Sequence, residues 1–126
     1  MVDIIERIEK VTKGGTIIPK PAAKDNFRIK GWGSRRGERA LVYTIPNHKD
    51  PNRPYQKGVT ITEWLQAYHQ LVTNGDFRRS WFDQFMPDCA KEGGCNYTTI
   101  GGVFELLGDA EYSGPGLYRR VGHANS

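Results

Sequence analysis

The fold is decided by residues 60–74, which read TITEWLQAYHQLVTN. Thr60 and Glu63 fit a capping box, in which the threonine hydroxyl accepts from the Glu63 amide and the Glu63 side chain reaches back to the amide of Thr60. After this box the apolar residues recur at helical spacing and form one stripe of Ile61, Trp64, Leu65, Tyr68, Leu71 and Val72. The pattern predicts an amphipathic helix that ends at Asn74-Gly75.

Two more helices and a hairpin are expected between this helix and the end of the chain. Asp76 is the N-cap expected for an aromatic helix that Pro87 stops, and residues 88–96 are expected to be a loop. A third helix, capped by Thr98 or Thr99, completes the helical run over residues 60–107. A short hairpin with a Gly-Pro-Gly tip follows at residues 111–121.

Gly101 and Gly102 lie inside the third expected helix. Each glycine in a helix interior costs about 1 kcal/mol relative to alanine, so the pair needs a compensating reason. We expect another backbone segment, such as a packed strand, to approach the helix closely at this point.

The first half of the chain is expected to supply one helix and one β-hairpin. Residues 1–15 contain a short amphipathic helix, with an apolar face made of Ile4, Ile5, Ile8 and Val11. A hairpin is expected over residues 27–45, because an alternating segment is followed by a turn and then by the nearly continuous apolar run ALVYTI. Three prolines and a glycine predict a loop over residues 46–58.

These segments together predict an α+β fold, in which a small antiparallel hairpin or sheet packs against three to four short helices. The chain length suits a single domain over residues 1–126. No apolar run approaches the roughly 20 residues that span a bilayer, and charges interrupt the N-terminus at once, unlike in a signal peptide. We therefore expect a cytoplasmic location and no membrane partner.

Three short helices followed by a tight hairpin resemble the winged-helix class of helix-turn-helix proteins. The resemblance is one of layout over residues 60–121, and it rests on the stretch TTIGGVFELLG at 98–108 and on the hairpin that ends in Arg119 and Arg120. In that family the N-terminal residues of the last helix enter the major groove, and the wing holds phosphates, here through the two arginines. The resemblance implies DNA contacts by Tyr97, Thr98, Thr99, Gly101 and Gly102. This sequence departs from the family because its third helix carries no Lys or Arg and exposes only Glu105.

Positive charge is concentrated in the first half of the chain. Residues 1–59 hold 13 Lys and Arg and 6 Asp and Glu, a net charge of +7, whereas residues 60–126 have a net charge of −3. Trp32 lies in the hairpin among a cluster of cations, namely Arg28, Lys30, Arg35, Arg36 and Arg39. Arginine pairs with phosphate bidentately and tryptophan can stack on a base, so this cluster predicts nucleic-acid contacts. The same surface would be extended by Lys49, Arg53 and Lys57.

The leading hypothesis from the sequence is a small, regulatory nucleic-acid-binding protein that holds the phosphate backbone of DNA or RNA through the basic hairpin. The alternative is a protein-interaction or small-ligand-binding accessory module, for example from a mobile element, whose aromatic helices leave a patch or pocket and which forms a homodimer. An ordinary solvated surface, with Trp32 in the core, would account for the same charges.

Catalytic and metal-binding motifs are absent from the sequence. There is no nucleophile elbow, no His-Glu-x-x-His and no Walker loop, so an enzyme is not expected. Cys89 and Cys95 lie six residues apart with no second ligand pair at zinc spacing, so no metal or other cofactor is expected.

Overall fold

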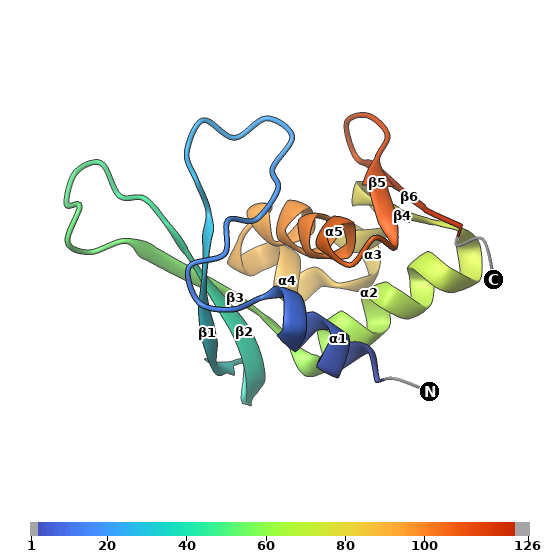
Figure 1. The fold of residues 1–126 in the computed structure, drawn as a ribbon, viewed down its shortest axis with the longest axis horizontal. Helices are drawn as coiled ribbons and strands as arrows, with labels where there is room; N and C mark the ends of the chain where they lie inside the picture. Colours follow the sequence, from blue (N-terminus) through green and yellow to red (C-terminus); the bar gives the residue numbers. More distant parts are fainter. Residues whose placement is uncertain (1–2, 123–126) are drawn as a thin grey trace.

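A computed structural model describes residues 3–122 and confirms the α+β prediction (Figure 1). Over these residues the chain forms five helices and two three-stranded antiparallel sheets. In chain order the elements are α1 (Ile4–Val11), β1 (Arg28–Arg35), β2 (Glu38–Ile45), β3 (Tyr55–Thr60), α2 (Ile61–Asn74), β4 (Asp76–Arg78), α3 (Arg79–Phe85), α4 (Pro87–Glu92), α5 (Cys95–Leu106), β5 (Ala110–Tyr112) and β6 (Leu117–Arg120). None of the described helices is long and apolar enough to cross a membrane.

The first sheet has the strand order β1–β2–β3. The hairpin expected at residues 27–45 forms β1 and β2, and β3 pairs with β2 where the sequence had predicted a loop. Leu41 and Tyr43 of β2 point into the core, whereas Val42 between them faces the other side, because successive residues of a strand alternate. The sheet therefore has an inner face against the helices and an outer face that carries Val42.

The second sheet has the order β4–β6–β5, so the hairpin expected at residues 111–121 forms and gains a third strand. Figure 1 shows the two sheets on opposite sides of the helices, with β1–β3 at one end of the molecule and β4–β6 at the other. The basic hairpin and the wing-like hairpin therefore do not share one face.

The capping box at the start of α2 is present as predicted. The Glu63 amide donates to Thr60 Oγ1 over 3.2 Å, and the Thr60 amide donates to Glu63 Oε1 over 2.9 Å. Gly75 ends the helix with a left-handed φ of 84°. Because Thr60 is also the last residue of β3, the sheet and the helix join without a loop.

The predicted boundaries after α2 need three corrections. Asp76–Arg78 forms β4 rather than a helix start, since Phe77 pairs with Tyr118 of β6. Pro87 begins α4 where a loop was expected. Proline suits this position because the amides of a helix's first turn have no partner within the helix, so its missing N–H costs no hydrogen bond. The last helix begins at Cys95, before Thr98 and Thr99.

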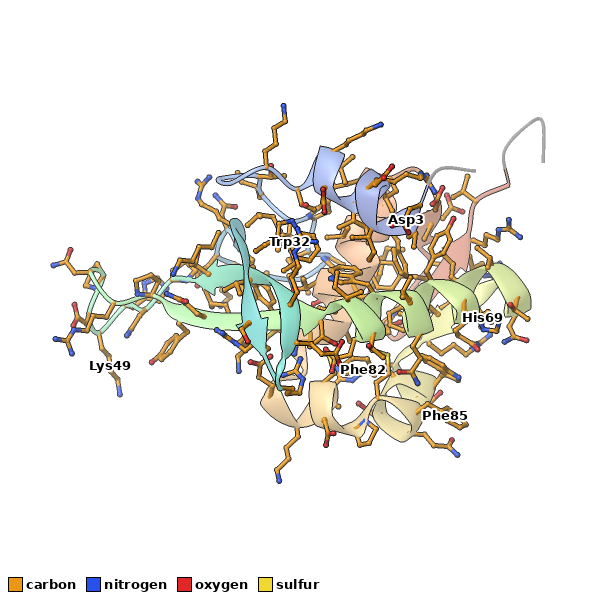
Figure 2. All side chains as sticks on the ribbon, turned by 90° about the horizontal axis from the view of Figure 1, so that it is seen from below. Asp3, Trp32, Lys49, His69, Phe82 and Phe85 are labelled. Atoms are coloured by element: carbon orange, nitrogen blue, oxygen red, sulfur yellow. The ribbon has the colours of Figure 1, made fainter. Side chains whose placement is uncertain are left out.

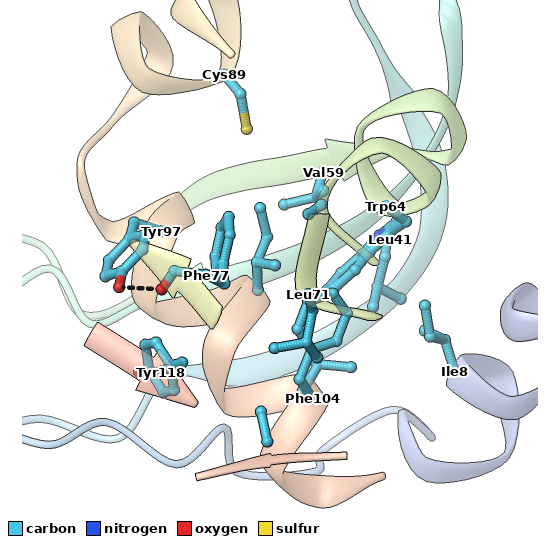
Figure 3. Packing of buried hydrophobic residues seen from close by; sticks show 14 of the residues in the cluster. Ile8, Leu41, Val59, Trp64, Leu71, Phe77, Cys89, Tyr97, Phe104 and Tyr118 are labelled. Atoms are coloured by element: carbon cyan, nitrogen blue, oxygen red, sulfur yellow. Dashed lines mark hydrogen bonds between the residues drawn. The ribbon is translucent and has the colours of Figure 1, made fainter. Parts of the chain in front are cut away.

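Helix α5 lies in the middle of the core (Figure 3). It is buried over nearly its whole length, and the Tyr97 hydroxyl donates to the Phe77 carbonyl over 2.8 Å. A Cβ on Gly101 would collide with the Tyr118 ring, and one on Gly102 would collide with the Pro19 carbonyl oxygen. The predicted approach of another backbone is thus confirmed at Gly102, where it comes from an irregular segment rather than a strand, whereas a side chain approaches Gly101 instead.

Candidate functional site

Arg36, in the turn between β1 and β2, is directed back onto the helices. Its Nε and Nη2 atoms donate to the two carboxylate oxygens of Glu63 over 2.9 and 2.6 Å, and its Nη1 lies 3.2 Å from Glu92 Oε1. Burial works against the charge of Arg36, but the hydrogen bonds and charges of Glu63 and Glu92 outweigh it and raise the pKa of Arg36. Arg36 is therefore committed to contacts within the fold.

Two other hairpin arginines are also paired. Arg35 Nε lies 3.1 Å from Glu92 Oε2, and Arg39 Nη2 lies 3.2 Å from Glu9 Oε1. The Arg39 guanidinium also stacks over the Trp32 ring at 4.2 Å, and this half-buried tryptophan packs against the core. One face of Trp32 is thereby covered, so its predicted stacking on a base would have to use the other.

A groove of about 310 Å³ lies in the outer face of the first sheet. It is lined by Lys30, Gly31, Trp32, Gly33, Ser34, Arg35, Val42 and Gln56, and none of these carries a carboxylate. Gly31 and Gly33 contribute to this lining, and Val42 pairs with Gly31 on one side and with Gly58 on the other. A Cβ on Gly58 would lie only 2.9 Å from Arg35 Cγ, so this strand position has no room for a side chain.

Of the cations at this groove, Lys30 and Arg28 have no carboxylate partner in the described part of the chain, whereas Arg35 is paired with Glu92. Lys30 Nζ donates to Gln56 Oε1 over 3.2 Å, and Arg28 Nη1 makes a long contact of 3.4 Å with the Gly15 carbonyl. Lys49 lies on the loop between β2 and β3, which projects away from the helices (Figure 2), and Arg53 of the same loop lies 3.6 Å from Asp50. The structure thus brings Arg28, Lys30 and Arg35 to one side of the sheet.

The residues of α5 that the winged-helix resemblance directs towards DNA lie inside the molecule. Tyr97 is 2% exposed and Thr99 is 1% exposed, and Gly101 and Gly102 are buried, so the prediction is wrong for these four residues. The physical reason is that segment 16–20 covers Thr99 and Gly102, while Phe77 of β4 and Tyr118 of β6 cover Tyr97 and Gly101. The hydroxyl of Thr98, which is partly buried, accepts a hydrogen bond from segment 16–20 instead of facing solvent.

Arg119 and Arg120 of β6 are both exposed. Arg120 Nη1 donates to the Val72 carbonyl over 3.1 Å, whereas Arg119 has no carboxylate partner within residues 3–122. Their contact with phosphate stays a prediction. It belongs to a separate surface, because the second sheet lies at the opposite end of the molecule from the groove (Figure 1).

The sequence did not reveal Lys20, which holds segment 16–20 onto α5. Its Nζ donates to the Cys95 carbonyl over 2.9 Å and to the hydroxyls of Thr98 and Thr99 over 2.8 Å each. The ammonium also lies over the Phe27 ring, 4.5 Å from its centroid. Burial lowers the pKa of Lys20 from its ordinary 10.5 to about 7. No local signal marks this residue, since a lysine between two prolines reads as an exposed loop position.

Lys20 makes the stability of the protein depend on pH. Between pH 7 and 10.5 the unfolded chain holds a proton on Lys20 that the folded protein has largely lost, so the free energy of unfolding rises with pH across this window. The stability that the neutral Lys20 amine contributes is complete above pH 10.5 and is lost as the pH falls through 7. From pH 7 to 9.5, the free energy of unfolding should rise by about 3 kcal/mol more in the parent than in Lys20→Met. Urea titrations of both proteins at the two pH values test this, and parallel pH profiles would contradict it.

The two cysteines are free thiols. Cys89 is buried, and this burial raises the pKa of its thiol. Cys95 is partly buried, and the Tyr43 hydroxyl lies 3.2 Å from its sulfur. Within residues 3–122, no group of three or more His, Cys, Asp or Glu side chains could hold a metal ion.

Comparison of the chain with models of protein families, with curated proteins and with solved structures finds no match.

Proposed function

We propose that the protein binds the phosphate backbone of a nucleic acid along the outer face of the β1–β3 sheet. The observation that carries this proposal is the groove lined in part by Gly31 and Gly33, which has Lys30 and the Glu92-paired Arg35 in its lining and no carboxylate of its own. Arg28 lies on the same strand, without a carboxylate partner in the described residues.

The chemistry of the groove suits an extended polyanion. Glycine inside a strand commonly marks a place where a ligand or another backbone approaches closely, and Gly31 and Gly33 of β1 are two such positions in the lining of this groove. Lys and Arg side chains pair with phosphate oxygens, and binding gains free energy from the counterions that are released. The Gln56 amide, now bonded to Lys30, offers a further polar contact.

The winged-helix layout of residues 60–121 offers a second, separate contact. In that family the last helix enters the major groove through its N-terminal residues, but here Lys20 and segment 16–20 occupy this part of α5. Of the predicted wing contacts, Arg119 and Arg120 are both exposed, and Arg120 donates to the Val72 carbonyl. We therefore expect the wing to contribute little beside the sheet.

The proposal predicts salt-dependent binding that the sheet residues control. Fluorescence anisotropy should detect binding of labelled single-stranded or duplex DNA or RNA at 50 mM salt, and this binding should weaken steeply by 200 mM salt. In Arg28→Gln/Lys30→Gln, the slope of log affinity against log salt should become shallower by about 2, because two phosphate contacts are lost.

A matched variant separates a specific surface from net charge. Lys10→Gln/Lys91→Gln removes the same two charges from the exposed ends of α1 and α4 and should bind as the parent does. An equal loss of affinity in both double variants would show that the overall charge, rather than this surface, accounts for the binding. No binding to any of the four nucleic acids at 50 mM salt would overturn the proposal, and a loss confined to Arg119→Gln would move the site to the wing.

Exposed apolar side chains on α2 and α3 support protein binding as a second candidate function. Leu65 is 45% exposed and Phe85 is 51% exposed, and the Trp81 and Phe85 ring centroids lie 5.5 Å apart. Gln66 Nε2 donates to the Phe85 carbonyl over 2.9 Å and so joins the two helices at this patch. Apolar patches of this kind commonly mark protein contacts. Light scattering that shows a stable dimer with no affinity for nucleic acid would favour this function.

A further inference from the structure

The loop between β2 and β3, residues 46–54, forms an arm that projects from the end of the first sheet, away from the helices (Figure 2). Its two ends continue the β2–β3 ladder, because Ile45 is paired with Tyr55 at the last register position. The arm takes no part in the lining of the groove on the outer face. It is therefore a second element that a ligand lying on this sheet would meet.

Hydrogen bonds within the arm hold it in one shape. Asn47 Oδ1 accepts from the amides of Lys49 and Asp50 over 3.1 and 3.3 Å, and Asn47 Nδ2 donates to the Arg53 carbonyl over 3.0 Å. Backbone bonds from Asp50 to the Asn47 carbonyl and from Arg53 to the Asp50 carbonyl close two successive turns. Three prolines fix further backbone angles. Because the arm is already ordered, little of the free energy of binding is spent on ordering it.

The side chains at the surface of the arm are of the types that contact base edges. Lys49 and Asn52 are exposed, and neither side chain has a hydrogen-bond partner within residues 3–122. Arg53 lies 3.6 Å from Asp50, and its side chain is 86% exposed. Arginine binds the O6 and N7 atoms of guanine through two hydrogen bonds, and asparagine binds N6 and N7 of adenine, all in the major groove. The arm therefore offers contacts to bases as well as to phosphates.

Positive charge is concentrated around the arm. Residues 12–30 and 46–57 hold eight Lys and Arg and two Asp, a net charge of +6. At the foot of the arm, Arg28 lies opposite Thr44 on the outer face, and Lys30 lines the groove beside it. At the other end of the same strands, the arginines of the hairpin turn are paired with carboxylates. A polyanion is therefore attracted to the end of the sheet that carries the arm.

The dimensions of the arm favour one form of nucleic acid. Paired strands lie about 4.8 Å apart, and the major groove of B-form DNA, about 12 Å wide, admits such a ribbon, whereas the minor groove of about 6 Å does not. The major groove of an RNA duplex is too deep and narrow for side chains to read.

A single strand suits this surface less well than a duplex. Proteins hold single strands largely by stacking bases on aromatic rings. Tyr55, at the foot of the arm, is exposed, but it lies on the opposite face of the sheet from Arg28. Its partner Ile45 is two residues from the core residue Tyr43 and shares that face, whereas Arg28 is paired with Thr44 of the outer face. The ring and the cations therefore do not form one stacking platform.

We propose that the arm enters the major groove of B-form DNA, while Arg28 and Lys30 hold the phosphates at the border of that groove. Arg53 and Asn52 contact base edges, and Lys49 adds a positive charge to the contact. This inference rests on the proposed function and assigns to it a duplex ligand and a second contact element.

A comparison of nucleic-acid forms tests the proposal on the full chain. Fluorescence anisotropy at 50 mM salt measures the affinity for a labelled DNA duplex, for one of its single strands and for an RNA duplex of the same sequence. The DNA duplex should bind about tenfold more tightly than either of the others, or better. Equal affinity for all three would overturn this inference and leave the proposed function standing. No binding to any of them would overturn both.

Arg53→Lys isolates the contact that the arm makes with bases. The variant keeps the charge but loses the planar pair of donors, so the affinity for the DNA duplex should fall by about fivefold or more. The slope of log affinity against log salt should not change, because no charge is lost. Arg119→Lys makes the same exchange at an exposed position of β6 and should bind as the parent does. Equal affinities of Arg53→Lys and the parent would refute base contact by the arm.

Dimethyl sulfate reports which groove is occupied, because it methylates N7 of guanine in the major groove and N3 of adenine in the minor groove. Saturating protein should protect guanine N7 in the DNA duplex and leave adenine N3 reactive. In Asn52→Ala/Arg53→Ala, the protection of guanine N7 should be lost even at protein concentrations that restore saturation. Protection of adenine N3 instead of guanine N7 would contradict the proposal.

Discussion

Gly102→Ala is expected to destabilise the protein by about 3 kcal/mol or more, even though alanine is the better helix former. The new Cβ would collide with the Pro19 carbonyl oxygen and would lie 2.8 Å from Ile18 Cγ2. Neither neighbour can move freely, because Ile18 is buried and the Ile18 amide is bonded to the Phe27 carbonyl. Urea unfolding of the variant and of the parent gives the difference in the free energy of unfolding.

Gly122→Ala is the matched control. Nothing lies within 4 Å of a Cβ at this position, so its stability should stay within about 0.5 kcal/mol of the parent. If Gly102→Ala were instead stabilised by about 1 kcal/mol, helix propensity alone would be acting. The close contact between segment 16–20 and α5 would then be disproved.

Glu92→Ala is expected to cost about 3 kcal/mol of stability, because one carboxylate joins four partners. Glu92 bonds to the side chains of Arg35 and Arg36, and it also accepts from the Gly58 amide over 3.1 Å and from Asn96 Nδ2 over 3.0 Å. Removing it leaves two guanidinium groups short of a partner and leaves the buried Asn96 with an unpaired N–H. Denaturant unfolding at pH 7 measures the loss.

The effect of Glu92 should fade in acid. Burial alone would raise the pKa of Glu92, but hydrogen bonds from Asn96 and Gly58 and the charge of Arg36 outweigh it and lower the pKa. The stabilisation is therefore complete above the pKa of Glu92 in the unfolded chain and is lost as the pH falls through the lower folded value. The parent and Glu92→Ala should converge in stability towards pH 3.

Glu111→Ala is the control for this prediction. Glu111 is exposed on β5, and its substitution should change stability by about 0.5 kcal/mol or less at either pH. A difference between the parent and Glu92→Ala that stays constant down to pH 3 would show that packing, rather than the charge of Glu92, stabilises this junction.

Sequence reasoning succeeded where the determinants are local. The capping box of Thr60 and Glu63 spans four residues, and its hydrogen bonds follow from the sequence alone. Gly101 and Gly102 likewise predicted a close approach to their helix, because glycine inside a helix is unfavourable unless a neighbour packs too closely for a side chain. The α+β class followed from the helical and alternating spacing of the apolar residues along the chain.

The rest depends on partners that are distant in the sequence. Arg36 lies 27 residues from Glu63, and Arg35 lies 57 residues from Glu92, so the cluster of cations in the sequence could not show that the fold neutralises part of it. Lys20 and Thr99 are 79 residues apart. Short strand β4 was missed for the same reason, because only its pairing with β6 makes it a strand.

The direct junction of β3 with α2 has a mechanical consequence. From β1 to β6 the connections are short except for residues 46–54, since α2 follows β3 and α3 follows β4 without an intervening residue. The other long segment, residues 12–27, meets this loop where His48 Nε2 lies 3.0 Å from Asp25 Oδ2. Two long loops therefore meet at one end of the first sheet. A partner lying on that sheet would meet hydrogen-bonded strands beneath it and these two loops at its border.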